Sequence, residues 1–409
     1  MFTSFALLAL AAHSVFAWPD TPFSTSGRNI YDECGNEVLF AGVNWPGHLE
    51  AMIPEGLQYS SIADIVSKIR SLDLNVIRLT YAIQMIDDHL DGNPNSGLNA
   101  SLYNALGEGS APGVLQQILT HNPQFTADTT RLEIFDAVAE ECAKQELWIH
   151  LDNHQSKAYW CCPQWDGNAW FNDTSFSVYN WTRGLGFMAD RAKNWDALVS
   201  MSLRNELRPP ASSQTALPYN WKTWVDNVIP AATAIHGNNS SPLIFFSGLN
   251  WDTNLDLLIT GSDSSSNATF TPSDYPFEDK MVYEVHNYAN SASCDVIAPG
   301  LYSGAYAAMN LSDPNVMNHA PVVLSEFGFD QTDGSDQGAY AQCLKNALVN
   351  APGGPGGWMY WDIVGSYYTR IGAIDSDETW GLLNHNWTDW RNQTVLDEYF
   401  LPLIKTTLG

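Results

Sequence analysis

Residues 128–154 read DTTRLEIFDAVAEECAKQELWIHLDNH, and the pattern of this stretch decides the fold. Its first part, Asp128–Gln145, carries apolar side chains at helical spacing, namely Leu132, Phe135, Val138, Ala139 and Cys142. This spacing predicts an amphipathic helix with one face on a core. Its second part, Leu147–Asn153, is a short apolar run, which predicts a buried strand. The stretch therefore predicts a helix that is followed directly by a strand.

The same alternation continues on both sides of this stretch. Further amphipathic helices are expected at Ile62–Leu72, Ser177–Asn194, Trp221–His236 and Gln337–Asn350. The expected strands are Val38–Trp45, Asn75–Tyr81, Leu147–Asn153, Leu198–Glu206, Pro242–Asn250, Met281–Tyr288, Pro321–Phe329 and Gly357–Val364. Eight strands alternating with helices predict the α/β class and a (β/α)8 barrel, although a doubly wound open sheet has the same alternation. We see no linker rich in Pro, Ser or Thr and no repeat, so we expect residues 18–409 to form a single domain.

The ends of the expected strands favour the barrel over the open sheet. Most of these ends carry polar or aromatic side chains, among them Asn44, Arg78, Asp152, Asn205, Asn250, His286, Glu326 and Trp361. The active site of a barrel takes its residues from the C-terminal ends of many different strands. An open sheet would instead concentrate them at one switch point.

The composition excludes two classes of partner. The formal net charge is −27, from 18 Lys and Arg against 45 Asp and Glu. Nucleic acids and anionic membrane surfaces bind through basic patches, so neither is an expected partner. Charged residues make up 15% and aromatic residues 12% of the chain, a composition that predicts a folded chain with one large core. We expect a monomer.

The N-terminus indicates export. Residues 1–17 are an apolar stretch that ends in the small-residue pattern Val15-Phe16-Ala17, which we interpret as a signal peptide. The expected product is a secreted, extracellular protein that begins near Trp18. An even number of cysteines in such a chain favours disulfides, with the pairing left open, among Cys34, Cys142, Cys161, Cys162, Cys294 and Cys343. Sequons that predict N-glycosylation in a eukaryotic host occur at Asn99, Asn172, Asn180, Asn238, Asn239, Asn267, Asn310, Asn386 and Asn392.

Two glutamates stand where a barrel enzyme would place catalytic carboxylates. Glu206 ends the fourth expected strand, and Glu326 lies near the end of the seventh. Strands four and seven of an eight-stranded barrel lie across its mouth from each other. Two carboxylates that face each other over a cleft are what glycoside hydrolysis requires. Two separate structural carboxylates are the alternative interpretation.

Other side chains at the strand ends fit a polar ligand. Arg78 could hold a nearby carboxylate in its ionised form, or form a structural ion pair inside the barrel. Two pairs of residues each share a strand face, because their members are two positions apart: Asp152 with His154, and His286 with Tyr288. Aromatic rings stack on the C–H faces of sugars, and among the many aromatic residues near these ends we single out Trp361.

Taken together, these motifs make the chain resemble glycoside hydrolase family 5, in the retaining (β/α)8 group called clan A. Within that family it looks most like the secreted endo-β-1,4-glucanases. The resemblance spans nearly the whole chain after the signal peptide. It rests on the segments Asn75–Leu79, Leu151–His154, Asn205–Glu206, Val285–Tyr288, Ser325–Gly328 and Trp358–Trp361.

The resemblance implies a role for each site residue. Glu206 is expected to be the acid/base, and Glu326 the nucleophile of a double displacement. Asn205 is expected to hold the 2-hydroxyl of the sugar in subsite −1. The other expected roles are charge tuning of Glu326 by Arg78 and Tyr288, contacts to the sugar and the acid/base by His154 and His286, and a sugar platform at Trp361. No cofactor and no metal are expected.

Some features leave the substrate open. Arginines flank the acid/base at Arg204 and Arg208, and Asp362 stands where similar enzymes often have a second Trp. The alternatives to β-1,4-glucan are mannan, a glycolipid or another β-glycoside, and an inactive carbohydrate-binding barrel is a remote one. A zinc peptidase is excluded, because His150 and His154 would lie about 13 Å apart on a strand.

Overall fold

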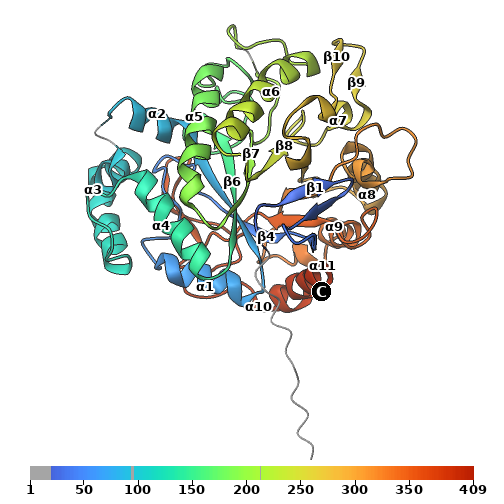
Figure 1. The fold of residues 1–409 in the computed structure, drawn as a ribbon. Coiled ribbons are helices and arrows are strands. Elements are labelled where there is room, and N and C mark those ends of the chain that lie inside the picture. The colour runs from blue at the N-terminus through green and yellow to red at the C-terminus, as the bar shows by residue number, and fades with distance from the viewer. Residues whose placement is uncertain (1–19, 94–95, 212) are drawn as a thin grey trace, which may run out of the picture.

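The structure, a computed structural model, describes residues 20–93, 96–211 and 213–409, so the predicted signal peptide at residues 1–17 lies outside the described residues. A closed barrel of parallel strands forms its centre, with helices around it (Figure 1). In barrel order from the N-terminus, the strands are β4 (Ala41–Trp45), β5 (Val76–Ala82), β6 (Trp148–Gln155), β7 (Leu198–Ser202), β8 (Leu243–Phe246), β11 (Met281–Asn287), β12 (Val322–Phe327) and β13 (Gly357–Tyr360). β13 pairs with β4 and closes the ring. The predicted (β/α)8 barrel is confirmed.

The strands of the barrel are buried because both of their faces are covered. Every residue of β5 and β6 is buried, on one face by the barrel interior and on the other by helices. Their parallel register places Val76 beside Trp148 and Arg78 beside His150. The same register places Arg78 beside Asn44 of β4. The C-terminal ends of the strands therefore meet at one mouth.

All five predicted helices are present. They are α1 (Ile62–Ser71), α4 (Arg131–Lys144), α5 (Val178–Arg191), α6 (Trp221–Asn238) and α9 (Ala339–Val349). α4 begins with a capping box: the Thr130 hydroxyl accepts from the Glu133 amide at 3.3 Å, and the Glu133 carboxylate accepts from the Thr130 amide at 2.7 Å. Helices that the sequence analysis did not predict are α2 (Ile83–Leu90), α3 (Leu98–His121), α7 (Asp256–Thr260), α8 (Cys294–Gly304), α10 (Gln393–Val395) and α11 (Leu401–Leu408).

A small antiparallel sheet covers the N-terminal end of the barrel. It consists of β1 (Ser24–Ser26), β2 (Asn29–Tyr31) and β3 (Glu37–Val38). The predicted strand Val38–Trp45 is therefore divided, since Val38 joins this sheet and the barrel strand begins only at Ala41. Two hairpins complete the strands, β9 (Ser262–Asp263) with β10 (Ala268–Thr269) and β14 (Ser366–Arg370) with β15 (Ala373–Asp377).

Several barrel strands end earlier than the sequence predicted. β7 stops at Ser202, four residues before Glu206, and β13 stops at Tyr360, just before Trp361. Glu206 has a φ of 48°, in the left-handed region, which is incompatible with a continuing strand. Its amide instead donates to the carboxylate of Asp252 at 2.8 Å. The catalytic candidate on this side is thus presented by a turn.

The cysteines form two disulfides among the described residues. Cys294–Cys343 joins α8 to α9, and Cys161–Cys162 joins two neighbours in the loop after β6. Cys34 and Cys142 are free, and Cys142 belongs to the apolar face of α4. In the described part of the chain, no helix combines the length and the apolar character that crossing a membrane requires.

Candidate active site

A pocket of about 860 Å³ opens at the C-terminal mouth of the barrel. Its walls come from the ends of β6, β11 and β12, from the segments that follow β6, β7, β8, β11 and β13, and from the β14–β15 hairpin. Of the predicted site residues, it is lined by His154, Glu206, His286, Tyr288, Glu326 and Trp361. Arg78 and Asn205 lie behind this surface, fully buried, and contact the lining residues. All eight predicted residues are therefore brought together.

The two glutamates face each other at short range. Glu206, Glu326 and His286 each offer one ligand-type atom, and these atoms all lie within 4.8 Å of one another. Both carboxylates are buried, with side-chain exposures of 9% for Glu206 and 5% for Glu326. Carboxyls of a retaining glycosidase lie about 5–5.5 Å apart, whereas those of an inverting one lie about 6.5–9.5 Å apart. The approach of one oxygen of each carboxylate to within 4.8 Å fits the retaining class.

Glu326 is held by two donors. Arg78 donates from Nη1 to Oε1, and the Tyr288 hydroxyl donates to Oε2 at 3.0 Å. Arg78 is itself fixed, because its Nη2 donates to Asn205 Oδ1 at 2.8 Å and lies 3.0 Å from Asp152 Oδ1. Burial raises the pKa of Glu326, although the neighbouring His286 and Arg78 act in the opposite direction. Two donors on one carboxylate favour its ionised form.

Glu206 has the environment of an acid. Burial raises its pKa from 4.5 to about 7, although the charges of Arg208 and Arg78 act in the opposite direction. Its Oε1 lies 3.0 Å from Nδ1 of His286. Burial also lowers the pKa of His286, which keeps that ring neutral. Glu206 is thus the carboxyl of the pair that can carry a proton near neutrality.

A chain of hydrogen bonds sets the tautomer of His286. Ser325 donates its single hydroxyl proton to Glu284 Oε2 at 3.0 Å, so its oxygen accepts from Nε2 of His286, also at 3.0 Å. Because the neutral ring carries its proton on Nε2, Nδ1 is an acceptor. The partner of Nδ1 is Glu206, which must then donate. The network itself therefore favours a protonated Glu206.

Comparison with known proteins identifies the family. The model of "Cellulase (glycosyl hydrolase family 5)" matches residues 31–364. The chain belongs to glycosyl hydrolase family 5. It is 32% identical to a glycosyl hydrolase 5 family protein of Chamaecyparis obtusa, over 98% of this chain and 71% of that one. It is 24% identical to an endoglucanase of Paenibacillus polymyxa, over 93% of this chain and 88% of that one.

Solved structures show the same fold. An endocellulase of Pyrococcus horikoshii, in complex with cellotetraose, matches with a TM-score of 0.67 at 18% identity, over 96% of this chain and 100% of that one. The catalytic domain of the major endoglucanase of Xanthomonas campestris matches with a TM-score of 0.65 at 18% identity, over 94% of this chain and 99% of that one. The family-5 resemblance noted in the sequence is confirmed, and the chain is a glycoside hydrolase similar to endoglucanases.

The remaining predicted residues form one wall of this family-5 pocket. His154 donates from Nδ1 to Asp152 Oδ2 at 2.7 Å, which leaves Nε2 as an acceptor 3.4 Å from Asn205 Nδ2. Burial lowers the pKa of His154 well below its ordinary value, so the ring is neutral. The Trp361 ring stacks on the His154 ring, with centroids 5.4 Å apart and planes at 20°. Trp361 thus presents a flat apolar face to the pocket.

The arginines that flank Glu206 do not line the pocket. Arg204 and Arg208 are each 1% exposed and lie beneath the loop of residues 156–168. Arg204 donates to the Asn168 carbonyl at 2.8 Å, and Arg208 donates to the Asp166 carboxylate at 2.6 Å. Their function is to fix that loop to the segment that carries Glu206.

Sequence reasoning missed part of the lining. Trp160, Cys161, Cys162, Trp251 and Trp380 also line the pocket. Signals existed for the tryptophans, since Trp251 follows the fifth expected strand, and Trp160 and Trp380 lie in loops after strands three and eight. Nothing in the sequence distinguished them from aromatic residues that pack inside loops.

Two groups in the described chain have metal-ligating atoms close together. They are Glu206 with His286 and Glu326, and His154 with Cys161 and Cys162. The sulfurs of the second group are joined in a disulfide, and a metal ligand would have to be a thiolate. In the first group, Glu206 is hydrogen-bonded to His286, and Glu326 is hydrogen-bonded to Arg78 and Tyr288. That the enzyme needs no metal remains a prediction from the sequence.

Proposed function

We propose that this enzyme is a secreted, retaining β-glycosidase of the endo-β-1,4-glucanase type, with Glu326 as nucleophile and Glu206 as acid/base. The observation that carries the proposal is the contrast between two carboxyls within 4.8 Å of each other. One is held by Arg78 and Tyr288, and the other has a pKa of about 7 and lies beside an acceptor nitrogen. Such a pair supplies an anion and an acid at the same pH.

In the first step, Glu326 attacks C1 of the sugar as the glycosidic C–O bond breaks. The proton on Glu206 passes to the leaving oxygen, which departs as an alcohol. A covalent glycosyl–Glu326 ester and an ionised Glu206 remain. Before the attack, Arg78 and Tyr288 orient the Glu326 carboxylate, and Asn205 holds Arg78 in place from behind the pocket surface. That Asn205 holds the 2-hydroxyl of the sugar remains a prediction from the family resemblance.

In the second step, Glu206 acts as a base. It takes a proton from a water molecule whose oxygen attacks C1, and the ester bond to Glu326 breaks. Glu206 is protonated again, Glu326 is again a carboxylate, and the sugar keeps its β configuration. His286 lies 3.0 Å from Glu206 and can accept its hydrogen bond in the acid state.

The substrate assignment is supported by aromatic lining and by the relatives. Trp160, Trp251, Trp361 and Trp380 line the pocket, and such rings stack on sugar faces. The similar proteins from P. polymyxa and X. campestris are endoglucanases, and cellotetraose binds the P. horikoshii endocellulase. We therefore favour β-1,4-glucan over mannan, glycolipid or other β-glycosides, and a secreted monomer as the active form.

Azide rescue tests the two roles separately. With an activated aryl β-glycoside, Glu326→Ala and azide are expected to give the α-glycosyl azide, because azide enters from the vacated nucleophile side. Glu206→Ala and azide are expected to give the β-glycosyl azide, because azide replaces the attacking water. If each variant gave the anomer expected of the other, the roles of Glu326 and Glu206 would be exchanged. If azide restored activity to neither variant, the mechanism would be contradicted.

A substrate panel tests the specificity. Soluble β-1,4-glucan, mannan and aryl β-glycosides are incubated with the wild type and with Glu326→Gln, and reducing ends are measured together with viscosity. We expect β-1,4-glucan to be cleaved by the wild type only, with a fall in viscosity ahead of the release of reducing ends. Preferential cleavage of mannan or of short glycosides would replace the proposed substrate. Binding without cleavage would indicate an inactive carbohydrate-binding barrel.

A further inference from the structure

A strained turn lies beside the acid/base candidate. Asn250, Trp251 and Asp252, which follow β8, have φ values of 54°, 57° and 57°. Residues other than glycine rarely adopt this left-handed conformation, and a run of three persists only where the surrounding structure holds it. Glu206 has the same conformation, with a φ of 48°. Two left-handed segments thus meet at the mouth of the barrel.

Asp252 is the residue that joins the two segments. It is fully buried, and its Oδ2 accepts from the amide of Glu206 at 2.8 Å. Its own carbonyl accepts from the amide of His286 at 3.1 Å. The side chains of His286 and Glu206 meet in turn, with Nδ1 and Oε1 3.0 Å apart. Asp252, Glu206 and His286 therefore form a closed ring of three contacts, which ties the acid/base and its hydrogen-bond partner to one residue.

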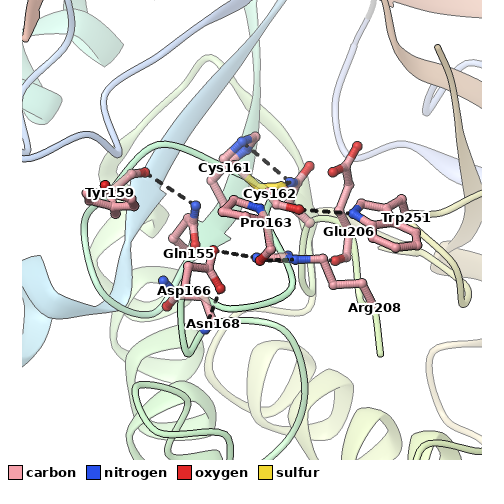
Figure 2. Close-up of a disulfide and its surroundings, with 12 residues drawn as sticks. Gln155, Tyr159, Cys161, Cys162, Pro163, Asp166, Asn168, Glu206, Arg208 and Trp251 are labelled. Carbon is pink, nitrogen blue, oxygen red and sulfur yellow. Dashed lines mark hydrogen bonds and ion pairs between the residues drawn. A yellow bond between two sulfur atoms is a disulfide. The ribbon is translucent and has the colours of Figure 1, made fainter. Parts of the chain in front are cut away.

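The neighbour of Asp252 fixes the turn from two other sides. The Trp251 amide donates to the Leu207 carbonyl at 3.1 Å, in the residue that follows Glu206. The Trp251 indole donates to the Cys162 carbonyl, also at 3.1 Å, in the loop after β6 (Figure 2). The turn cannot relax to an unstrained conformation without losing these bonds. The carboxyl of Asp252 is consequently held in place against the amide of Glu206.

The contact between Asp252 and Glu206 is a hydrogen bond to a neutral carboxyl. Burial, together with the nearby carboxyls of Glu284 and Glu206, raises the pKa of Asp252 well above its ordinary value. In the described part of the chain, Oδ1 of Asp252 has no hydrogen-bond partner, so the bond from the Glu206 amide is the one that this side chain makes. The carboxamide of Asn offers an acceptor oxygen of the same shape without a charge. Asn should therefore replace Asp252, whereas a residue without an acceptor should not.

We propose that Asp252 is a positioning residue for the acid/base. By accepting from the Glu206 amide, it holds Glu206 in the left-handed conformation that aims its carboxyl at His286 and at the glycosidic oxygen. Asp252 is fully buried and does not line the pocket, so it acts through Glu206. Without this bond the Glu206 segment is free to leave the left-handed region, and its carboxyl moves away from His286. This inference rests on the proposed function, because it takes Glu206 as the acid/base.

Two aryl β-glycosides with the same sugar and different leaving groups test the position of the acid. Dinitrophenolate departs without a proton, whereas phenolate needs the proton of Glu206. The ratio of kcat/KM for the dinitrophenyl substrate to that for the phenyl substrate therefore rises when the acid is lost, and faults in sugar binding cancel. We expect Asp252→Gly to raise this ratio about a hundredfold, the cost of displacing a reacting group by about 1 Å. Gly adopts a φ of 57° without strain, so the variant keeps the turn.

Three further variants separate positioning from structure. Asp252→Asn keeps the acceptor and tolerates the left-handed conformation, so its ratio is expected to equal that of the wild type. Asp252→Ala lacks the acceptor and should raise the ratio as Asp252→Gly does, which preserves the test if the glycine variant does not fold. Asp362→Ala is the matched control. Asp362 is another fully buried residue at this mouth, and its carboxylate accepts from the Val364 amide at 2.9 Å in the segment after β13. Its removal should lower both activities together and leave the ratio unchanged.

The outcomes distinguish this inference from the proposed function. Glu206→Gln removes the acid and sets the upper limit of the ratio. If the ratio rises in Glu206→Gln but in neither Asp252→Gly nor Asp252→Ala, the inference is overturned and the proposed function stands. A rise in Asp252→Asn or Asp362→Ala as large as that in Asp252→Gly would also overturn the inference. If the ratio does not rise in Glu206→Gln, Glu206 is not the acid, and the inference and the proposed function are both overturned.

Discussion

The two ends of the barrel are buried to a similar degree and contain opposite chemistry. At the N-terminal end, an apolar cluster joins the small β1–β3 sheet to the first residues of the barrel strands, with members such as Phe23, Phe40 and Trp148. The Phe23 and Trp148 rings meet edge to face, with centroids 5.0 Å apart. At the C-terminal end, charged groups are buried instead, among them Arg78, Asp152, Glu206, Glu284 and Glu326.

Burial has a different consequence at each end of the barrel. Burial of apolar surface at the N-terminal end stabilises the fold. Burial of carboxyls at the C-terminal end disfavours their ionised forms and raises the pKa of both Glu206 and Glu326. The first end should therefore control stability without affecting turnover, and the second should control turnover at a cost in stability.

The largest expected effect is at the mouth. Glu326→Gln keeps the shape of the side chain and removes the nucleophile, so we expect kcat/KM to fall by about four orders of magnitude or more. Burial already raises the pKa of Glu326, which means that the fold disfavours its charge. The free energy of unfolding, measured in urea at neutral pH, should therefore stay equal or increase. A large loss of stability would contradict the division between the two ends.

The opposite result is expected at the other end. Phe23 is 1% exposed and packs on Trp148 and Phe40. Phe23→Ala leaves a cavity under the β1–β3 sheet, and we expect the free energy of unfolding to fall by about 3–5 kcal/mol. In the folded fraction, kcat/KM should equal that of the wild type. A change in kcat/KM below the unfolding transition would show that the two ends are coupled.

The sequence predicted the barrel because its strands are covered on both faces. Continuous apolar runs such as Leu243–Phe246 of β8 can be recognised without knowledge of the neighbouring strands. The β1–β3 sheet escaped notice because its strands are two or three residues long and carry polar side chains, as in Ser24–Ser26. Its stability comes from contacts with the barrel, which only the folded chain brings together.

The same reasoning explains the outcome at the site. Glu206 and Glu326 could be paired from strand order, because opposite strands meet at one mouth. The Cys161–Cys162 bond and its contact with Asn205 could not, since they depend on how the loop is fixed by Arg204 and Arg208. A loop held by buried ion pairs has no local pattern that predicts its position.

The smallest expected effect depends on pH and concerns Glu206. Its pKa is 4.5 in the unfolded chain and about 7 in the fold. Between these values the unfolded state is ionised and the folded state is protonated, so the stability contributed by this group is complete below pH 4.5 and is lost as the pH rises to 7. The lost stability amounts to about 3 kcal/mol at 1.36 kcal/mol per pKa unit. The side chain of Glu206→Gln cannot ionise. The free energy of unfolding of this variant, taken relative to that of the wild type, should therefore be about 3 kcal/mol higher at pH 8 than at pH 4.

The same ionisation must appear in the activity of the wild type if the two ends differ as described. Glu206 has to be protonated to release the leaving group, so kcat/KM should fall about tenfold per pH unit above pH 7. The stability difference between the wild type and Glu206→Gln should stop changing at the pH where this decline begins, because both are set by the pKa of Glu206 in the folded enzyme. A different result would be a decline in activity near pH 7 in both the wild type and Phe23→Ala, with no pH-dependent difference in stability between the wild type and Glu206→Gln. The proton lost near pH 7 would then belong to another group. Agreement of these two pH values would show that the stability lost at the mouth is the direct consequence of keeping an acid there.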